Sequence, residues 1–271
     1  MPARPAKPRP DNQMQPSSPS GLRVLAAIPA RYTSTRFPGK ALAQLAGRPL
    51  IEHVYRRAAA APGVDRVVVA TDDARIVQAV EAFGGEARLT RADHRSGSDR
   101  LAELVESIEC DLVVNVQGDE PLLDSRALAQ ALAPFSTDAA LQVSTLMTRI
   151  RDPETLFSLH AVKVRTDARG FAVSFTRAPD PPLPGDAEVD LEVQPYFKHL
   201  GLYVYRRDVL LRFAQLPPTP REEREKLEQL RLLEHGIPIR VVETEYDSIG
   251  IDTPDDLARA EAALLAHGGA S

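Results

Sequence analysis

The stretch LRVLAAIPARYTSTRFPGK, residues 22–40, joins a mostly apolar run to a basic loop. We predict that residues 22–28 form a buried strand, and the run RVVVAT at 66–71 has the continuous apolar character that is typical of a strand buried on both faces of a parallel sheet. The loop that follows carries three cations, Arg31, Arg36 and Lys40. Arginine matches phosphate oxygens two at a time and lysine adds a mobile point charge, so we interpret the loop as a polyphosphate site. A solvated basic loop is the alternative interpretation.

Apolar runs and amphipathic helical patterns alternate along the first half of the chain. We expect strands at 22–28, 66–71, 87–90, 112–117 and 141–146. Between them we expect a helix that begins near Pro49 and helices over 74–83, 99–108 and 125–135. This alternation predicts an α/β fold with a doubly wound, mostly parallel sheet.

The alternation changes after about Arg149, where an antiparallel lobe is expected at about 152–205. Its predicted parts are a hairpin of 162–165 with 171–175 and a strand at 199–205. The pattern then predicts helices at 207–215 and 221–235, a strand at 239–242 and a last helix at 254–266. We therefore predict one domain at 22–271 with this lobe embedded in it, preceded by a disordered, Pro-rich tail at 1–21.

Composition and charge exclude several classes of protein. The chain has 271 residues, a net charge of -5 and one cysteine, Cys110. An acidic balance argues against a general nucleic-acid binder, and a single thiol fits a reducing cytosol. No apolar run reaches the ~18–20 residues that cross a bilayer, and the tail lacks the apolar core of a signal peptide. We expect a cytoplasmic protein that does not insert into membranes.

Two aspartates have the setting of magnesium ligands. Asp119 lies in NVQGDEP, residues 115–121, directly after a predicted strand. Asp252 lies in SIGIDTPDDL, residues 248–257, where Thr253, Pro254 and Asp256 already account for the start of a helix. Carboxylate oxygens suit Mg²⁺, and loops at the carboxyl ends of parallel strands share one edge of the sheet. A tight turn is the alternative for the first motif.

The ordered set of motifs resembles the 3-deoxy-D-manno-octulosonate (Kdo) cytidylyltransferase family. The strings that carry the resemblance are VLAAIPARYTSTRFPGKAL, VATDD, TRADHRSGSDRLAE, VNVQGDEPLL, HLGLYVYRRDVL, EKLEQLRLLEHG and GIDTPDDL. It extends from about Leu22 to Ala263. It implies a fold of the nucleotide-diphospho-sugar-transferase type, a homodimer, and a Mg²⁺-dependent reaction of CTP with Kdo that gives CMP-Kdo and pyrophosphate for lipopolysaccharide synthesis.

The resemblance also implies roles for individual residues. Catalytic roles fall on Arg31, Lys40 and Asp119, and metal binding falls on Asp119 and Asp252. Nucleotide binding falls on Arg31, Arg36, Lys40, Ser96, Gly97, Arg100 and Gln117. Sugar binding falls on Gln117, Arg177, His199, Glu225 and Gln229. The run APDPP at 178–182 departs from the family pattern after Arg177, on the side of the predicted sugar lid.

The implied mechanism is an in-line attack of the sugar's anomeric hydroxyl on the α-phosphorus of CTP, with pyrophosphate leaving toward the basic loop. One alternative keeps the chemistry and changes the sugar to 8-amino-Kdo or another acid sugar. A second is a nucleotide-sugar glycosyltransferase, which has no need of a loop for departing pyrophosphate. A third is a catalytically silent nucleotide-binding regulator, which has no reason to keep both acids and all three cations.

Overall fold

The computed structural model describes residues 21–33, 36–183, 189–247 and 250–268. Except for Gly21, the predicted tail at 1–21 lies outside these residues. Within them, no helix is both long enough and apolar enough to span a membrane.

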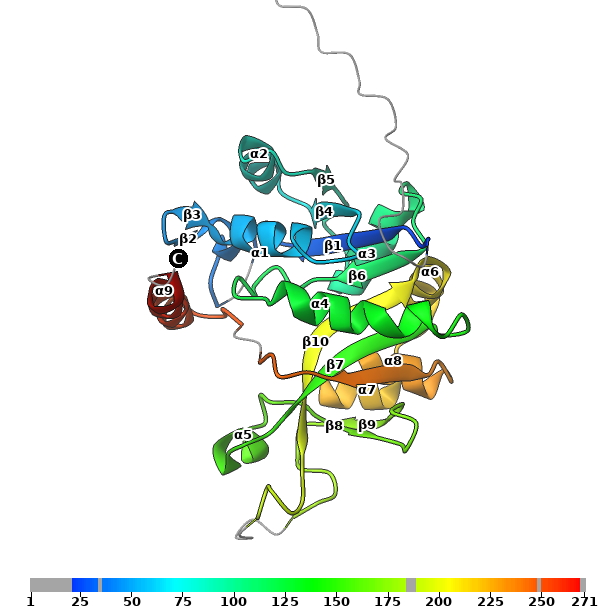
Figure 1. Cartoon of the computed structure of the whole chain (residues 1–271). Coiled ribbons are helices and arrows are strands. Elements are labelled where there is room, and N and C mark those ends of the chain that lie inside the picture. Colours follow the sequence, from blue (N-terminus) through cyan, green and yellow to red (C-terminus); the bar gives the residue numbers. More distant parts are fainter. Residues whose placement is uncertain (1–20, 34–35, 184–188, 248–249, 269–271) are drawn as a thin grey trace, which may run out of the picture.

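A single large sheet forms the centre of the molecule (Figure 1). Its main path runs β11, β7, β10, β6, β1, β4 and β5. In chain order these strands are β1 (Val24–Ala30), β4 (Arg66–Thr71), β5 (Ala87–Leu89), β6 (Leu112–Asn115), β7 (Val143–Arg149), β10 (Phe197–Arg206) and β11 (Ile239–Glu243). Neighbours pair in parallel except where β10 lies between β6 and β7. The prediction of a mostly parallel sheet with an antiparallel part is confirmed.

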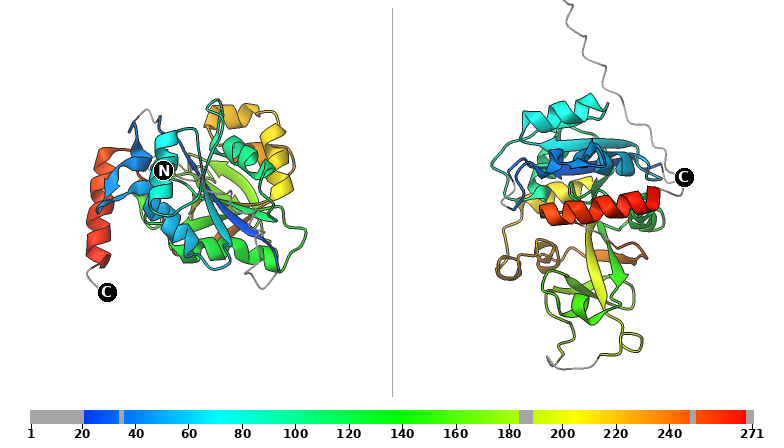
Figure 2. Two further views of the ribbon diagram at one scale, coloured as in Figure 1. Left: turned by 90° about the horizontal axis from the view of Figure 1, so that it is seen from above. Right: turned by 90° about the vertical axis from the view of Figure 1, so that its left-hand side faces the viewer.

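Helices cover both faces of this sheet (Figures 1 and 2). Successive residues of β1 point to opposite faces, so Ala26 packs into one apolar layer and Ala27 into the other. The first layer includes buried side chains of α1 (Leu50–Ala59), α2 (Ala74–Ala82), α4 (Ser125–Leu132) and α9 (Pro254–Gly268). The second includes those of α3 (Gly97–Glu106), α6 (Arg207–Gln215) and α8 (Gln229–Glu234). This arrangement is the doubly wound fold that the sequence predicts.

The lobe extends from the end of β7 and is built on β10 (Figure 1). Its elements are α5 (Pro153–Phe157), β8 (Lys163–Thr166) and β9 (Ala172–Thr176), and β8 pairs antiparallel with both β9 and β10. A small apolar cluster of Ile150, Leu156, Leu191 and Tyr196 packs within it, with Leu156 contributed by α5. The predicted hairpin is present with its strands shifted by one residue. The lobe limits of 152–205 stay a prediction.

The helices after β7 differ in number from those the sequence predicts. The sequence did not predict α5, which begins at Pro153 after an aspartate cap, Asp152. The predicted helix at 221–235 is two helices, α7 (Pro220–Glu225) and α8, because Lys226 has a left-handed backbone with φ 55°. The carbonyl of Glu225 at this break accepts a hydrogen bond from Arg177, 48 residues away. A tertiary contact thus caps α7 within a helical sequence pattern.

Short segments complete the fold. They are the 3-10 helices η1 (Lys40–Leu42) and η2 (Ala133–Ser136) and the two-stranded ribbon of β2 (Gln44–Leu45) with β3 (Arg48–Pro49). Pro49 precedes α1 as its N-cap residue instead of opening it. The helix that was expected to begin at Asp99 begins two residues earlier, because Ser96 caps it with Asp99 in a capping box.

Candidate active site

The predicted phosphate residues and the predicted metal ligands meet at the carboxyl edge of the sheet. Arg31 directly follows β1, and Asp119 follows β6, which pairs in parallel with β1. The amide of Ile251 donates to the carbonyl of Asp119 at 2.9 Å, which holds the segment of Asp252 beside Asp119. Adjacent parallel strands and one backbone hydrogen bond therefore bring three distant stretches of sequence together.

Lys40 lies between the two carboxylates. Its Nζ is 2.8 Å from Asp119 Oδ2 and 3.3 Å from Asp252 Oδ1. Arg36 reaches the same site, with Nη2 3.0 Å from Asp252 Oδ2. The two carboxylates thus converge on one cationic group. Two carboxylates together with phosphate oxygens are a donor set that Mg²⁺ accepts, so these residues fit the predicted metal.

The basic loop is folded back on its own beginning. The amide of Gly39 donates to the carbonyl of Tyr32 at 2.8 Å, and Gly39 has φ +73°, which favours glycine. A Cβ at this position would lie 3.2 Å from the Tyr32 ring. The guanidinium of Arg75 packs on the same ring, 3.4 Å from its centroid. These contacts fix the turn that delivers Lys40 to the two aspartates.

The loop before α3 borders the same region. Arg31 Nη2 donates to the carbonyl of His94 at 2.8 Å, and His94 Nε2 is in turn hydrogen-bonded to Glu103. Gly97 lies against Pro29 of β1, since a Cβ there would be 3.3 Å from Pro29 Cγ. Ser96 and Gly97 therefore lie beside β1, although Ser96 also has a structural role as the cap of α3.

Arg100 lies inside the protein. It is fully buried and donates to Thr90 Oγ1 at 2.5 Å and to Asp72 Oδ2 at 3.2 Å. These contacts give it a structural role in holding α3 against the end of β4. Its contact with a nucleotide stays a prediction.

A buried cavity of about 230 Å³ contains three of the five predicted sugar residues, Gln117, His199 and Gln229. Gln117 Nε2 donates to the carbonyl of Gly201 at 2.9 Å, which orients its amide in the cavity wall. The complete lining is Ser98, Asn115, Gln117, Val162, His199, Gly201, Tyr203, Tyr205, Phe213, Leu227, Glu228 and Gln229. Sequence reasoning thus found part of this lining.

Among the described lining residues that were not predicted, three carry a buried polar atom without a hydrogen-bond partner. Asn115 Oδ1, Tyr203 Oη and Glu228 Oε1 have no hydrogen-bond partner within the described part of the chain. Buried polar groups are nearly always paired, so three such atoms around one cavity indicate a polar ligand. In the sequence, Asn115 lies in the strand predicted at 112–117, Tyr203 in the strand predicted at 199–205 and Glu228 in the single helix predicted at 221–235. Only Asn115 gave a signal, because it begins the motif NVQGDEP that carries Asp119.

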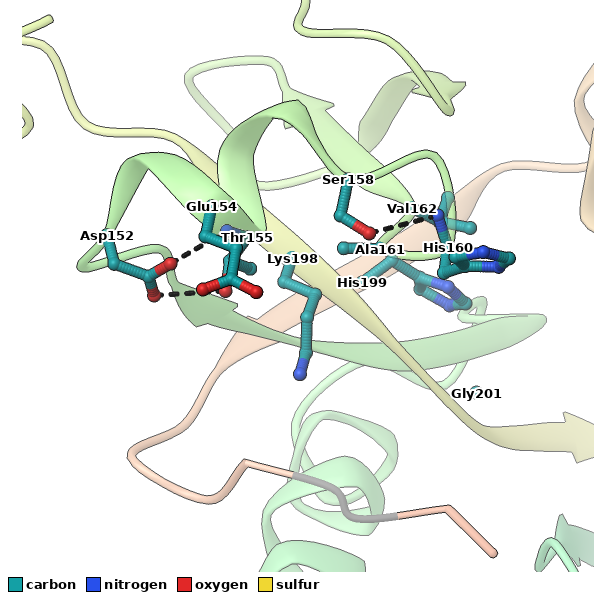
Figure 3. Close-up of a pocket in the computed structure, with 10 residues that line it drawn as sticks. All are labelled: Asp152, Glu154, Thr155, Ser158, His160, Ala161, Val162, Lys198, His199 and Gly201. Carbon is teal, nitrogen blue, oxygen red and sulfur yellow. Dashed lines mark hydrogen bonds between the residues drawn. The ribbon is translucent and has the colours of Figure 1, made fainter. Parts of the chain in front are cut away.

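A second cavity of about 760 Å³ lies on the lobe side and shares Val162, His199 and Gly201 with the first. In Figure 3 its wall runs from Asp152, the cap of α5, and Thr155 on α5 past Lys198 to His199. Lys198 forms an ion pair with Asp247, which follows β11. The two cavities therefore form neighbouring parts of one hollow region with His199 between them.

His199 is a neutral hydrogen-bonding group. Burial lowers its pKa to about 3. Its ring packs edge-on against Phe175, with 5.0 Å between the ring centroids. Thr145 Oγ1 lies 2.8 Å from the carbonyl of Leu202 and donates there, so it accepts from Nε2–H of His199 at 3.0 Å. The sugar end of the site thus offers directional hydrogen bonds from uncharged groups.

Arg177 and Glu225 are not among the described residues that line either cavity. Arg177 instead donates to backbone carbonyls, and the Glu225 carboxylate lies 3.6 Å from Arg224 Nε. The contacts of both residues with a sugar stay predictions.

Comparison with known proteins decides the family. The Cytidylyltransferase family model matches residues 25–242. The chain is 53% identical to the 3-deoxy-manno-octulosonate cytidylyltransferase of Syntrophotalea carbinolica over 247 residues, 90% of this chain and 99% of that protein. The chain belongs to the 3-deoxy-manno-octulosonate cytidylyltransferase family. The Geobacter metallireducens member is 51% identical over 87% of this chain and 95% of its own length.

A solved structure of a family member has the same fold. It is a CMP:2-keto-3-deoxy-manno-octonic acid synthetase in complex with CTP, and it matches with a TM-score of 0.84 at 44% identity. The match covers 90% of this chain and 99% of that one. A cytidylyltransferase from Leptospira borgpetersenii shares the fold with a TM-score of 0.61 at 18% identity. The resemblance seen in the sequence motifs is therefore confirmed.

Proposed function

We propose that this protein activates Kdo with CTP, giving CMP-Kdo and pyrophosphate for lipopolysaccharide synthesis. The observation that carries the proposal is the convergence of Lys40 on Asp119 and Asp252 next to a buried cavity with unsatisfied polar atoms. Membership of the family and the likeness to a synthetase bound to CTP support it.

Arg31, Arg36 and Lys40 hold the triphosphate of CTP in this proposal. Their loop is pinned at Gly39, so the cations are positioned before the nucleotide arrives. As the bond between the α- and β-phosphates breaks, negative charge grows on pyrophosphate, and fixed cations stabilise that charge. The oxygen of the sugar's anomeric hydroxyl bonds to the α-phosphorus and releases its proton to solvent water, while the oxygen that bridged the α- and β-phosphorus takes the electron pair of the broken bond and leaves with pyrophosphate.

Asp119 and Asp252 would hold Mg²⁺. When bound, the ion supplies charge neutralisation at the phosphates and favours ionisation of a nearby hydroxyl. Both carboxylates lie within 3.3 Å of Lys40 Nζ, so they are close enough together to share one cation. A titration of turnover against Mg²⁺ after treatment with a chelator tests this requirement.

The buried cavity orients the sugar. Asn115, Tyr203 and Glu228 offer unsatisfied atoms to hydroxyl groups, and Gln117 and His199 add oriented polar groups. A sugar held in this way places its anomeric hydroxyl for attack, and such alignment contributes ~7–11 kcal/mol to lowering a barrier.

A cytoplasmic location and a homodimer are further parts of the proposal, and both follow from the family resemblance. Four large apolar side chains are exposed on the described part of the lobe, namely Phe157, Leu159, Val173 and Val193, and each is available for contact with a second copy. Sedimentation of the purified protein tests the dimer.

A panel of nucleotides and sugars tests the activity. We expect pyrophosphate release with CTP and Kdo, and little with UTP or ATP. Pyrophosphate release only with 8-amino-Kdo would support the same cytidylyltransferase reaction with 8-amino-Kdo as the sugar substrate. Transfer from a nucleotide-sugar without pyrophosphate would indicate a glycosyltransferase, and nucleotide binding without any turnover would indicate a silent binder.

A further inference from the structure

Lys163, at the start of β8, is a buried lysine to which the proposed reaction gives no role. It is 2% exposed. Its Nζ donates to the carbonyl oxygens of Ser158 at 2.6 Å, Ala161 at 2.8 Å and Arg177 at 2.6 Å. An ammonium has three N–H donors, so these three acceptors use all of them.

Arg177 extends the same set of contacts to a second part of the chain. Its guanidinium donates to the carbonyls of Leu159 at 2.9 Å, Glu225 at 2.7 Å and Lys226 at 3.3 Å. Two cations and six backbone carbonyls therefore join loop 158–161, the end of β9 and the break between α7 and α8. We call this set of contacts the Lys163–Arg177 junction.

The junction holds positive charge without an ion pair. Neither Lys163 nor Arg177 has a carboxylate within 4.0 Å among the residues the structure describes. Burial and the neighbouring Arg177 charge lower the pKa of Lys163 to about 8. Burying the Lys163 ammonium without an ion pair costs free energy. A lysine at this position therefore indicates that its three hydrogen bonds to backbone carbonyls are needed to hold these segments together.

The segments that the junction joins form walls of the two cavities. Ser158 and Ala161 line the larger cavity, and Glu228 and Gln229 line the smaller one directly after the break. Val162 lines both, and its carbonyl accepts from the amide of His199 at 2.8 Å. None of the six accepting carbonyls belongs to the loops of Arg31, Lys40, Asp119 or Asp252.

We propose that Lys163 is a positioning residue for the sugar cavity, which it shapes by holding loop 158–161 and, through Arg177, the α7–α8 break in place. This inference rests on the proposed function, because it assigns the sugar to these cavities. A cavity that is formed before the ligand enters binds it without the cost of ordering its walls. The phosphate end of the site depends on other contacts, so Lys163 affects one substrate and not the other.

The test compares Lys163→Met with a matched control on the same strand. Arg165, two residues further along β8, is half exposed and pairs with Asp180 at 3.3 Å, so Arg165→Met removes a basic side chain outside the junction. We expect Lys163→Met to raise the KM for Kdo by at least ~10-fold, since misplacement by about 1 Å costs up to ~10²-fold. For Lys163→Met, the dissociation constant for CTP is expected to stay within about 2-fold of wild type. For Arg165→Met, both the KM for Kdo and the dissociation constant for CTP are expected to stay within the same range, because surface substitutions have small effects.

Each outcome has a separate meaning. An unchanged KM for Kdo in Lys163→Met overturns the inference. Equal losses for both substrates also overturn it, because they indicate a general structural role. If Lys163→Met does not fold, Lys163→Gln, which keeps two N–H donors without the charge, carries the same test. A wild-type protein that binds CTP but does not turn over Kdo would instead refute the proposed function, and this inference with it.

Discussion

The end of the site that carries Lys40, Asp119 and Asp252 is charged and partly exposed, whereas the cavity around His199 and Tyr203 is lined mainly by uncharged side chains, with Glu228 as the one carboxyl group among its described lining residues. The side chains of Asp119 and Asp252 are 33% and 44% exposed, and Tyr203 is 7% exposed. Burial lowers the pKa of His199, so this group stays uncharged near neutral pH. CTP is a polyanion, which suits the charged end. Kdo is a polyhydroxylated acid, whose hydroxyl groups suit the hydrogen-bonding atoms of the cavity.

The difference shows how one active site can use two kinds of recognition. Exposed charges attract phosphates but are screened by salt and tolerate small displacements. Buried hydrogen-bonding atoms tolerate neither displacement nor loss of a partner, because an unpaired buried polar group is costly. Substitutions at the two ends should therefore affect different kinetic constants.

The largest effect is expected from Asp119→Asn. It removes a charged ligand of the proposed metal, so we expect kcat to fall by at least ~10³-fold, the size of effect attributed to charge stabilisation in phosphoryl transfer. The measurement is pyrophosphate release under saturating CTP, Kdo and Mg²⁺, with a thermal melt to show that the fold survives. Asp138→Asn, on an exposed loop, is the control. Near-normal turnover by Asp119→Asn would remove Asp119 from the mechanism.

A smaller loss is expected from Lys40→Met. The variant lacks the cation that contacts both aspartates, so kcat should fall by ~10²–10³-fold, as when one stabilising donor is removed from a transition state. The dissociation constant for Kdo should change little. A loss of affinity for Kdo as large as the loss of kcat would contradict the division of the site into a phosphate end and a sugar end.

At the other end, Tyr203→Phe should weaken sugar binding alone. It removes a hydroxyl that is available to the ligand, so we expect the KM for Kdo to rise ~3–10-fold, from ~0.5–1.5 kcal/mol for one hydrogen bond. Tyr55→Phe loses a hydroxyl bonded to the Val67 carbonyl, outside either cavity, and serves as the control. An equal rise for CTP would contradict the division of the site.

The last prediction concerns not catalysis but the dependence of stability on pH at Lys163. Its pKa is about 8 in the folded protein and 10.5 ordinarily, so the unfolded chain binds more protons between these values. The free energy of unfolding of wild type relative to Lys163→Met should therefore rise with pH from about 8 to 10.5, by up to ~1.4 kcal/mol per pH unit. Urea unfolding of both proteins at pH 7.5, 8.5 and 9.5 measures the difference. A constant difference would show that Lys163 does not titrate in this range.

The two ends also differ in how well the sequence predicts them. Arg36, Lys40 and Asp119 lie in segments that follow predicted strands, and the rule that such segments share one edge of a sheet brings them together. Asp252 follows no predicted strand, and the hydrogen bond from the Ile251 amide to the Asp119 carbonyl holds its segment at this edge. The alternating pattern likewise predicts the doubly wound sheet. At the sugar end, Tyr203 and Glu228 fit an ordinary strand and an ordinary helix, and only their unsatisfied burial distinguishes them. The break at Lys226 depends on Arg177, which no local pattern connects to it.

The most direct test of the account measures both products of the wild-type protein in one reaction with CTP, Kdo and Mg²⁺. We predict one pyrophosphate for each CMP-Kdo, formed at a rate that Asp119→Asn does not approach. Pyrophosphate without CMP-Kdo, or CMP-Kdo at an equal rate from Asp119→Asn, would contradict it.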